Sequence, residues 1–278
     1  MTDFAIDHSS HRSPGWSPFF DKLLSASGKL WFTVAAAGQL AFIWFIVMYY
    51  GQRTWAGDLS EWNEKPLITG HVPGDAAGNI MFALHVFVAA IMTFGGAVQL
   101  VPAIRKHVPV FHRWNGRIFA GTAIFLAVGG LWLVWVRGTQ LSTISALAGT
   151  LNATLILAFV GLAVRFAIAR DFDTHRRWAM RAFLVANGVW FMRIGMMAWV
   201  ILAQGPVGMN RTLSGPMDIV ISFGCYLIPL AVVELYFQAQ RSSSAPLIII
   251  ATSATTLAAV ITAIGAVGTV VFMWGPYI

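Results

Sequence analysis

Charged residues are scarce in this chain of 278 residues. They make up 10% of it, far below the roughly 25% of an ordinary soluble domain, whereas apolar residues make up 58%. Cys225 is the only cysteine, which excludes an intrachain disulfide, a CxxC motif and a thiolate cluster for zinc or an iron–sulfur centre. The composition predicts an all-α membrane protein that crosses the bilayer several times, with no room for a second large domain.

Several signatures of catalysis and transport are also missing. No P-loop, HExxH or GxSxG motif occurs, and no GxGxxG lies in a strand–helix setting, so the common phosphate loop, zinc helix and nucleophile elbow are excluded. The last apolar segment has no lysine for the Schiff base that a seven-helix retinal protein needs. A proton-coupled transporter is expected to carry acids in mid-membrane, whereas Glu234 lies near the edge of its segment.

Seven apolar segments are long enough to span a bilayer, at about 20 residues each. They lie near residues 30–50, 79–102, 115–136, 145–169, 178–203, 217–239 and 246–273. Residues 29–278 are therefore expected to form one polytopic membrane helix bundle of seven transmembrane helices. Residues 1–28 are polar and form a leader, in which the aromatic stretch 16–24 suits either a short helix in the membrane interface or a disordered segment.

The net charge of +7 does not indicate a nucleic-acid partner, because the basic residues lie at the ends of apolar segments rather than along one stripe. Such charges set membrane topology by their excess on the cytoplasmic side. With the amino terminus inside, the outer loops hold four basic residues: Arg53, Lys65, Arg137 and Arg211. The inner segments then hold thirteen: Arg12, Lys22, Lys29, Arg105, Lys106, Arg113, Arg117, Arg165, Arg170, Arg176, Arg177, Arg181 and Arg241. We expect a protein of the bacterial inner membrane with a cytoplasmic amino terminus and an outer carboxyl terminus.

One polar motif occurs twice, each time between two apolar segments. It reads HRWNGR at 112–117 and HRRWAMR at 175–181. Aligned on the tryptophan, each copy has an arginine one residue before it, another three residues after it, and a histidine just upstream. We interpret the motif as the hinge of a two-helix hairpin that is used twice, over 79–136 and 145–203. The copies have the same orientation, so both hinges are expected at the cytoplasmic face.

Polar side chains within the membrane are candidate functional residues because they are costly there. Their depths predict two groups. The inner group comprises Gln99, His112, Arg113, Arg117, His175, Arg176, Arg177, Arg181 and Glu234. The outer group comprises His85, Arg193 and Asn152, with His71 as a weaker candidate in the adjoining loop. Glu234 is expected to pair with one arginine, since an unpaired carboxylate there is costly or protonated.

Three hypotheses account for the inner group. In the first, the arginines reach lipid phosphates, the tryptophans anchor the interface and each histidine caps or packs a helix start. In the second, His112 and His175 are the axial ligands of a haem b, whose propionates bind the arginines. In the third, the group binds an anionic lipid or the headgroup of a quinone.

The outer group has a structural and a functional interpretation. His85 and Arg193 would either hydrogen-bond to neighbouring carbonyl groups or to Asn152, or belong to a site. Arg193 cannot lose its charge, so it needs an acceptor, a water-filled cavity or a bound anion. The longest outer loop, 51–78, suits a lid, a partner surface or a simple connection.

The placement of HRxxGR and HRRWxxR at the heads of two spans, with a histidine in the span before the first, resembles a bacterial family of predicted membrane proteins, domain of unknown function 2306. The resemblance covers roughly residues 80–200 and implies no activity. The residues that it marks as functional are His85, Gln99, His112, Arg113, Gly116, Arg117, His175, Arg176, Trp178, Arg181 and Arg193. More distantly, the central four helices are similar to cytochrome b561-type proteins, which hold haem between paired histidines.

Our working hypothesis is therefore electron transfer, linked to haem b or to a quinone, at a cytoplasmic cluster of histidines and arginines. His112 and His175 would ligate the haem iron. The alternative is a non-enzymatic membrane subunit that binds anionic phospholipid headgroups. The expected partners are the lipid bilayer and a quinone or a redox partner.

Overall fold

The structure, a computed structural model, describes residues 18–65 and 67–278, which contain no strand. An all-α fold is thereby confirmed. The main helices are α1 (Pro18–Phe45), α2 (Gln52–Ala56), α3 (Ala76–Gln99), α4 (Pro102–His107), α5 (Pro109–Trp135), α6 (Thr143–Ile168), α7 (Phe172–Ala186), α8 (Gly188–Leu202), α9 (Pro216–Arg241) and α10 (Ala245–Gly268). The other helical elements are the short turns η1 (Ile46–Gly51), η2 (Leu59–Asn63), η3 (Thr269–Trp274) and η4 (Gly275–Tyr277).

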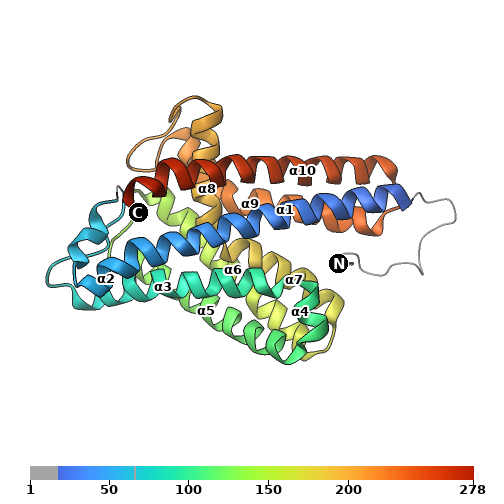
Figure 1. Cartoon of the computed structure of the whole chain (residues 1–278), viewed down its shortest axis with the longest axis horizontal. Helices are drawn as coiled ribbons and strands as arrows, with labels where there is room; N and C mark the ends of the chain where they lie inside the picture. The colour runs from blue at the N-terminus through green and yellow to red at the C-terminus, as the bar shows by residue number, and fades with distance from the viewer. Residues whose placement is uncertain (1–17, 66) are drawn as a thin grey trace.

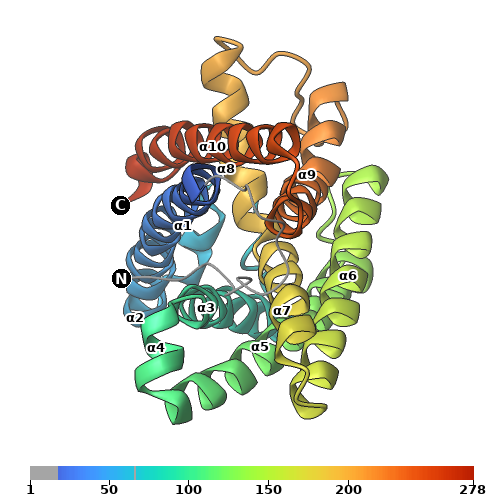
Figure 2. The same ribbon diagram turned by 90° about the vertical axis from the view of Figure 1, so that its right-hand side faces the viewer.

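Six of these helical segments are long and apolar enough to cross a membrane, and there are seven if the bent pair α7 and α8 is counted as one span. The number agrees with the seven apolar segments of the sequence. The helices form a ring in which α1 packs against α3 and α10, α3 against α5, α5 against α6, and α6 against α7. Helix α9 closes the ring by packing against α6, α7 and α10, as the view along the bundle shows (Figure 2).

The two ends of the bundle differ. Figure 1 shows α4 and the start of α7 at one end, which we call the motif end because α5 and α7 carry the two motifs there. The segment that follows α2 lies at the other end, which we call the loop end, together with the carboxyl terminus (Figure 1). Both motifs thus lie at the same end, as the repeat predicted.

Two helices begin earlier than the apolar pattern predicts. Residues 18–28 are continuous with α1 and do not form a separate short helix. Trp16, at the start of the predicted interfacial stretch, lies outside the described residues. Helix α5 begins at Pro109 instead of near residue 115, so the first motif forms its opening turns. Proline is favoured at the first position of a helix because its missing N–H has no partner there in any case. Pro102 begins α4 in the same way.

The fifth span is broken, where one continuous helix over 178–203 was expected. Helices α7 and α8 meet at Asn187 with a bend of 57°. The Asn187 side chain donates from Nδ2 to the carbonyl of Phe183 at 2.8 Å, and an amide that bonds to nearby backbone competes with helix propagation. Gly188 lies so close to Asn152 that a Cβ atom would be 2.8 Å from its Nδ2 atom. The apolar pattern continues across this point and therefore does not reveal the break.

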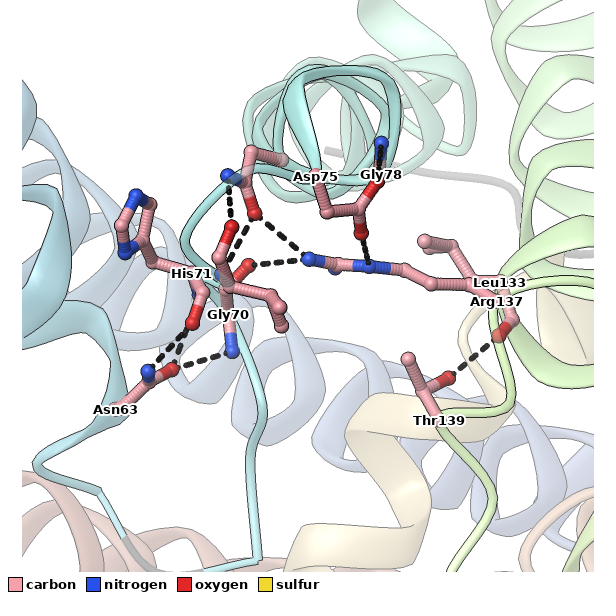
Figure 3. A network of polar contacts seen from close by, with 10 residues as sticks. Asn63, Gly70, His71, Asp75, Gly78, Leu133, Arg137 and Thr139 are labelled. Atoms are coloured by element: carbon pink, nitrogen blue, oxygen red, sulfur yellow. Dashed lines mark hydrogen bonds and ion pairs between the residues drawn. The ribbon is translucent and has the colours of Figure 1, made fainter.

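The segment between α2 and α3 is held firmly to the loop end. Arg137, which follows α5, donates from Nε to Asp75 at 2.8 Å and from Nη2 to Asn79 at 2.7 Å (Figure 3). Asp75 also accepts a hydrogen bond from the backbone of Gly78 at 2.8 Å and so begins α3. The Gly78 hydrogen bond, together with that of Arg137, holds the pKa of the Asp75 carboxyl below its usual range.

The same segment is also anchored near the carboxyl terminus. Tyr49 donates to the carbonyl of Glu61 at 2.9 Å, and Lys65 donates from Nζ to the carbonyl of Met273 at 3.0 Å. Trp62 is buried and contacts Phe82, with 5.6 Å between the ring centroids. The segment between α2 and α3 is therefore a packed part of the bundle.

The contact between α8 and α10 gives a first prediction. A Cβ atom at Gly265 would collide with the backbone oxygen of Ile194, so Gly265→Ala must force the two helices apart. We expect this substitution to lower the free energy of unfolding by about 1–3 kcal/mol. Gly149→Ala is the matched control, because no atom lies within 4 Å of the added methyl group and alanine favours helix over glycine. Thermal unfolding in detergent measures both, and an unchanged Tm for Gly265→Ala would contradict this packing.

Candidate functional site

A large cavity lies at the motif end of the bundle. It encloses about 1160 Å³ between the motif-end halves of the ring helices and reaches α8. Its polar lining consists mainly of Gln99, Arg105, His112, Arg113, Arg117, His175, Arg176 and Arg177. Most of the other lining residues are apolar, and no carboxylate is among the described residues that line it. The walls of the cavity are therefore mainly apolar, and one end of it is strongly basic.

The two motif histidines both line this cavity. Nδ1 of His175 lies 2.9 Å from the carbonyl oxygen of Ala163 on the preceding helix. An imidazole whose Nδ1–H donates to a carbonyl presents Nε2 as a free acceptor or metal ligand. Nδ1 of His112 is buried and has no hydrogen-bond partner within the described residues. The two motifs thus place both histidines on the lining of one cavity.

The two motifs share one local contact. The Arg117 guanidinium lies over the Trp114 ring at 4.9 Å from its centroid, and Arg181 lies over Trp178 at 4.5 Å. In both copies the partners are three residues apart on one helix face, where side chains meet, and a guanidinium is attracted to the face of an indole ring. The motif spacing thus encodes a tryptophan–arginine stack at each hinge.

The second arginine of each copy has a different role. Arg117 lines the cavity, whereas Arg181 does not. Arg181 instead donates from Nε and Nη2 to the two carboxylate oxygens of Glu234 on α9, at 2.5 and 2.8 Å. The expected pairing of Glu234 with one arginine is therefore present, and it removes both side chains from the cavity lining.

Gln99 is placed by the first motif. Asn115 donates from Nδ2 to the carbonyl of Gly95 at 2.8 Å and to Oε1 of Gln99 at 3.1 Å. The Gln99 amide lies against α5 at Gly116, where an added Cβ atom would be only 2.5 Å from the amide nitrogen of Gln99. The asparagine and glycine of HRWNGR thus hold Gln99 against the cavity. Sequence reasoning marked Gly116 but missed Asn115.

Arg105 was also missed as a site residue. In the sequence Arg105 stands out only as one of the charges that set topology, but α4 brings this residue to the cavity lining. Burial, together with the nearby charge of Arg176, lowers the pKa of Arg105 from its usual value. Like charges are therefore crowded at this end, and the lack of a repeated partner for Arg105 left no sequence signal for its role.

The predicted outer group lies apart from the cavity. His85 and Arg193 are not among its lining residues. The His85 ring rests against the second of two adjacent glycines on α5, 3.3 Å from where a Cβ of Gly130 would be. Arg193 donates from Nη1 to the carbonyl of Val189 at 3.0 Å. His71 lies in the loop, where its backbone N–H and carbonyl bond to Asn63 (Figure 3).

The donor set limits the metal chemistry of the described residues. Within 18–65 and 67–278, no group of three or more histidine, cysteine or acidic side chains is arranged to hold a metal ion. A metal held by two protein ligands and a macrocycle, as in haem, would need only the pair His112 and His175.

The fold and the cavity define a multi-pass helical membrane protein with a basic, amphiphilic cavity at one end. The chain belongs to the family described as predicted membrane protein DUF2306, which matches residues 82–237. This range includes both motifs and extends through most of α9. No curated protein and no solved structure matches the chain. A similarity to cytochrome b561-type cores is not shown by these comparisons.

The ion pair between Arg181 and Glu234 yields the second prediction. Arg181→Gln and Glu234→Gln should each destabilise the protein, and their effects should not add, because each removes the same bidentate contact. Since the Glu234 side chain is 42% exposed, we expect a coupling of only about 1 kcal/mol. A double-mutant cycle by thermal unfolding measures it. Arg241→Gln is the control at the end of the same helix as Glu234, and strict additivity for Arg181 and Glu234 would refute the pairing.

Proposed function

We propose that the protein binds an anionic amphiphile of the membrane in the cavity at the motif end. One observation carries this proposal: five arginines and two histidines line a cavity whose walls are otherwise largely apolar and whose described lining holds no carboxylate. The acidic head of the ligand would lie against the basic side chains. Its hydrocarbon part would contact the apolar walls formed by α6, α9 and α10.

The charge balance of the cavity favours an acidic ligand. Arginine keeps its proton in proteins, so the five like charges repel one another, although Arg176 also pairs with Asp173 at 3.4 Å. Glu234, the acid on a neighbouring helix, is engaged by Arg181. A phosphate or carboxylate relieves this repulsion and accepts bidentate hydrogen bonds from guanidinium groups. The cavity thus supplies a matched site for an anion at its end and for a lipid chain along its length.

The membrane orientation expected from the sequence is consistent with an anionic lipid as the ligand. The excess of basic residues assigns the motif end to the cytoplasmic side of the inner membrane by the positive-inside rule. Anionic phospholipids of the facing leaflet attract basic side chains at the membrane surface. A lipid from this leaflet could enter the cavity with its headgroup already at the depth of the arginines.

The third prediction tests this binding. Purified protein should retain anionic phospholipid in native mass spectrometry, and each of Arg117→Gln and Arg177→Gln should weaken its affinity about tenfold, because each removes one charged hydrogen-bond donor. Arg165→Gln is the matched control, since Arg165 lies near the motif end of α6 but is exposed and does not line the cavity. Equal binding of a zwitterionic phospholipid, or an equal loss in Arg165→Gln, would reject the proposal.

A second candidate, binding of haem b for electron transfer, is favoured by the histidines. His112 and His175 both face the cavity, and the contact of His175 with the Ala163 carbonyl is the kind of partner that orients a metal-binding imidazole. Haem is itself an amphiphile with two carboxylates, which arginines of the same cavity would bind. A quinone dissolved in the membrane would be a suitable redox partner.

Absorption spectroscopy provides the fourth prediction. If haem is the ligand, membranes enriched in the protein after haem feeding should show a Soret band that His112→Ala and His175→Ala each abolish. His107→Ala is the control, because this exposed histidine of α4 lies near His112 in sequence but does not line the cavity. Colourless wild-type protein would exclude haem and leave the lipid proposal intact.

A further inference from the structure

The lining of the motif-end cavity extends much further along some helices than along others. On α3 it begins only at Gly96, in the last turn of the helix. On α9 it runs from Gln240, at the motif end, to Val220, near the opposite end of the helix. At a rise of about 1.5 Å per residue, this stretch is roughly 30 Å long. The cavity thus continues along α9, beyond the motif-end half of the bundle, as a branch that we call the α9 branch.

The α9 side chains that line the branch form a continuous apolar strip. They come in adjacent pairs that recur every four residues, and residues four apart are neighbours on a helix surface. Beyond the middle of α9 the pairs are Val220 with Ile221 and Gly224 with Cys225. Helix α8 packs against α9 (Figure 2). A Cβ atom at Gly195 would lie 3.5 Å from Cγ2 of Ile221, so α8 forms a second wall at the far end of the branch.

The polar side chains along the branch are satisfied within their own helices. Sγ of Cys225 donates to the carbonyl of Ser222 at 3.3 Å. On α10, the hydroxyls of Thr255 and Thr262 donate to carbonyls of the preceding turn at 2.8 and 2.7 Å. These walls therefore offer van der Waals contact rather than free hydrogen-bonding groups, which suits a hydrocarbon chain and not a second polar head.

The branch is longer than one leaflet of the membrane is deep. From Tyr236, beside the basic end, to Val220 the strip measures roughly 24 Å along the helix. The hydrocarbon core of a bilayer is about 30 Å thick, so one leaflet provides about 15 Å. A chain that follows the whole strip therefore passes the midplane of the membrane while its head stays at the motif end.

We propose that the ligand of the cavity is an anionic lipid whose hydrocarbon chain follows α9 beyond the membrane midplane. This inference rests on the proposed function, because the basic end must hold the acidic head for the chain to enter the branch. Gly195 is then a residue that determines chain length, since the absence of a side chain leaves room beside Ile221. A chain that stops short of this level leaves the far end of the branch unfilled.

The fifth prediction uses phosphate monoesters that differ only in their chains. Decyl and docosyl phosphate form a short and long alkyl pair, and geranyl and solanesyl phosphate form a short and long prenyl pair. In native mass spectrometry of the full chain in detergent, the long member of a pair should bind more tightly, because its chain gains contacts along the branch. A preference in the alkyl pair alone identifies a straight chain, one in the prenyl pair alone a branched chain, and one in both shows that length decides; each supports the proposal.

Variants at the far end decide whether the α9 branch holds the chain. Gly195→Leu should weaken the binding of the preferred long probe about fivefold and leave its short partner unchanged, because the added side chain occupies the far end. Gly161→Leu on α6 is the matched control, since Gly161 does not line the cavity and no atom lies within 4 Å of the added Cβ atom. Should Gly195→Leu not fold, Val220→Trp replaces it, because Val220 lines the branch but is 55% exposed.

Arg117→Gln separates this inference from the proposed function. It acts on the head of the ligand and should weaken the short and long probes equally. Unchanged binding of the long probe by the far-end variants, or equal affinity of the wild type for short and long probes, overturns the long-chain ligand. The proposed function survives either result if Arg117→Gln still weakens binding. If the wild type binds none of the four probes, the proposed function fails and the inference falls with it.

Discussion

The break of the fifth span at Asn187 is the constraint on which the rest of the architecture depends. At Asn187, whose backbone N–H and side-chain Nδ2 both donate to the carbonyl of Phe183, α7 and α8 diverge by 57°. The first half can then pack against α6 and the second against α10. One span thus serves both sides of the ring. Both halves line the cavity, α7 between Phe172 and Leu184 and α8 at Phe191, Ile194 and Gly195.

The repeated motif explains why basic side chains line the cavity, but it does not explain why the second arginines of the two copies have different partners. Each copy supplies a histidine and a tryptophan–arginine stack, because the motif spacing fixes which side chains share a helix face. Their surroundings differ, since α9 carries Glu234 beside the second copy only. Arg181 therefore forms a bidentate ion pair, while Arg117 remains directed to the cavity. Both motifs carry basic groups to one end of the bundle, and one acid on α9 determines which arginine is withdrawn.

The sequence predicts the features that depend on length and periodicity, and it misses those that depend on tertiary contacts. Seven apolar runs give the spans, and the repeated motif brings His112 and His175 to the same end. The run 178–203 remains apolar through Asn187, so hydropathy cannot show the bend there. Arg105 looks like a topology-setting charge until α4 folds back toward the cavity. The sequence also does not show which arginine pairs with Glu234, because several arginines lie at a similar depth.

The depth of the cavity decides between binding and passage. Its lining reaches Trp31, Phe191 and Ile194, and beyond them lies an aromatic core that includes Phe42, Tyr50 and Trp274. An anionic headgroup that moved into this core would have to displace stacked rings, such as Phe42 on Trp274 at 5.4 Å between centroids. Carrying an anionic head from the motif end toward Arg193 would require separating these rings and dehydrating the charge at once. A ligand that entered at the motif end would therefore have its favourable position there, and this is the argument for proposing binding.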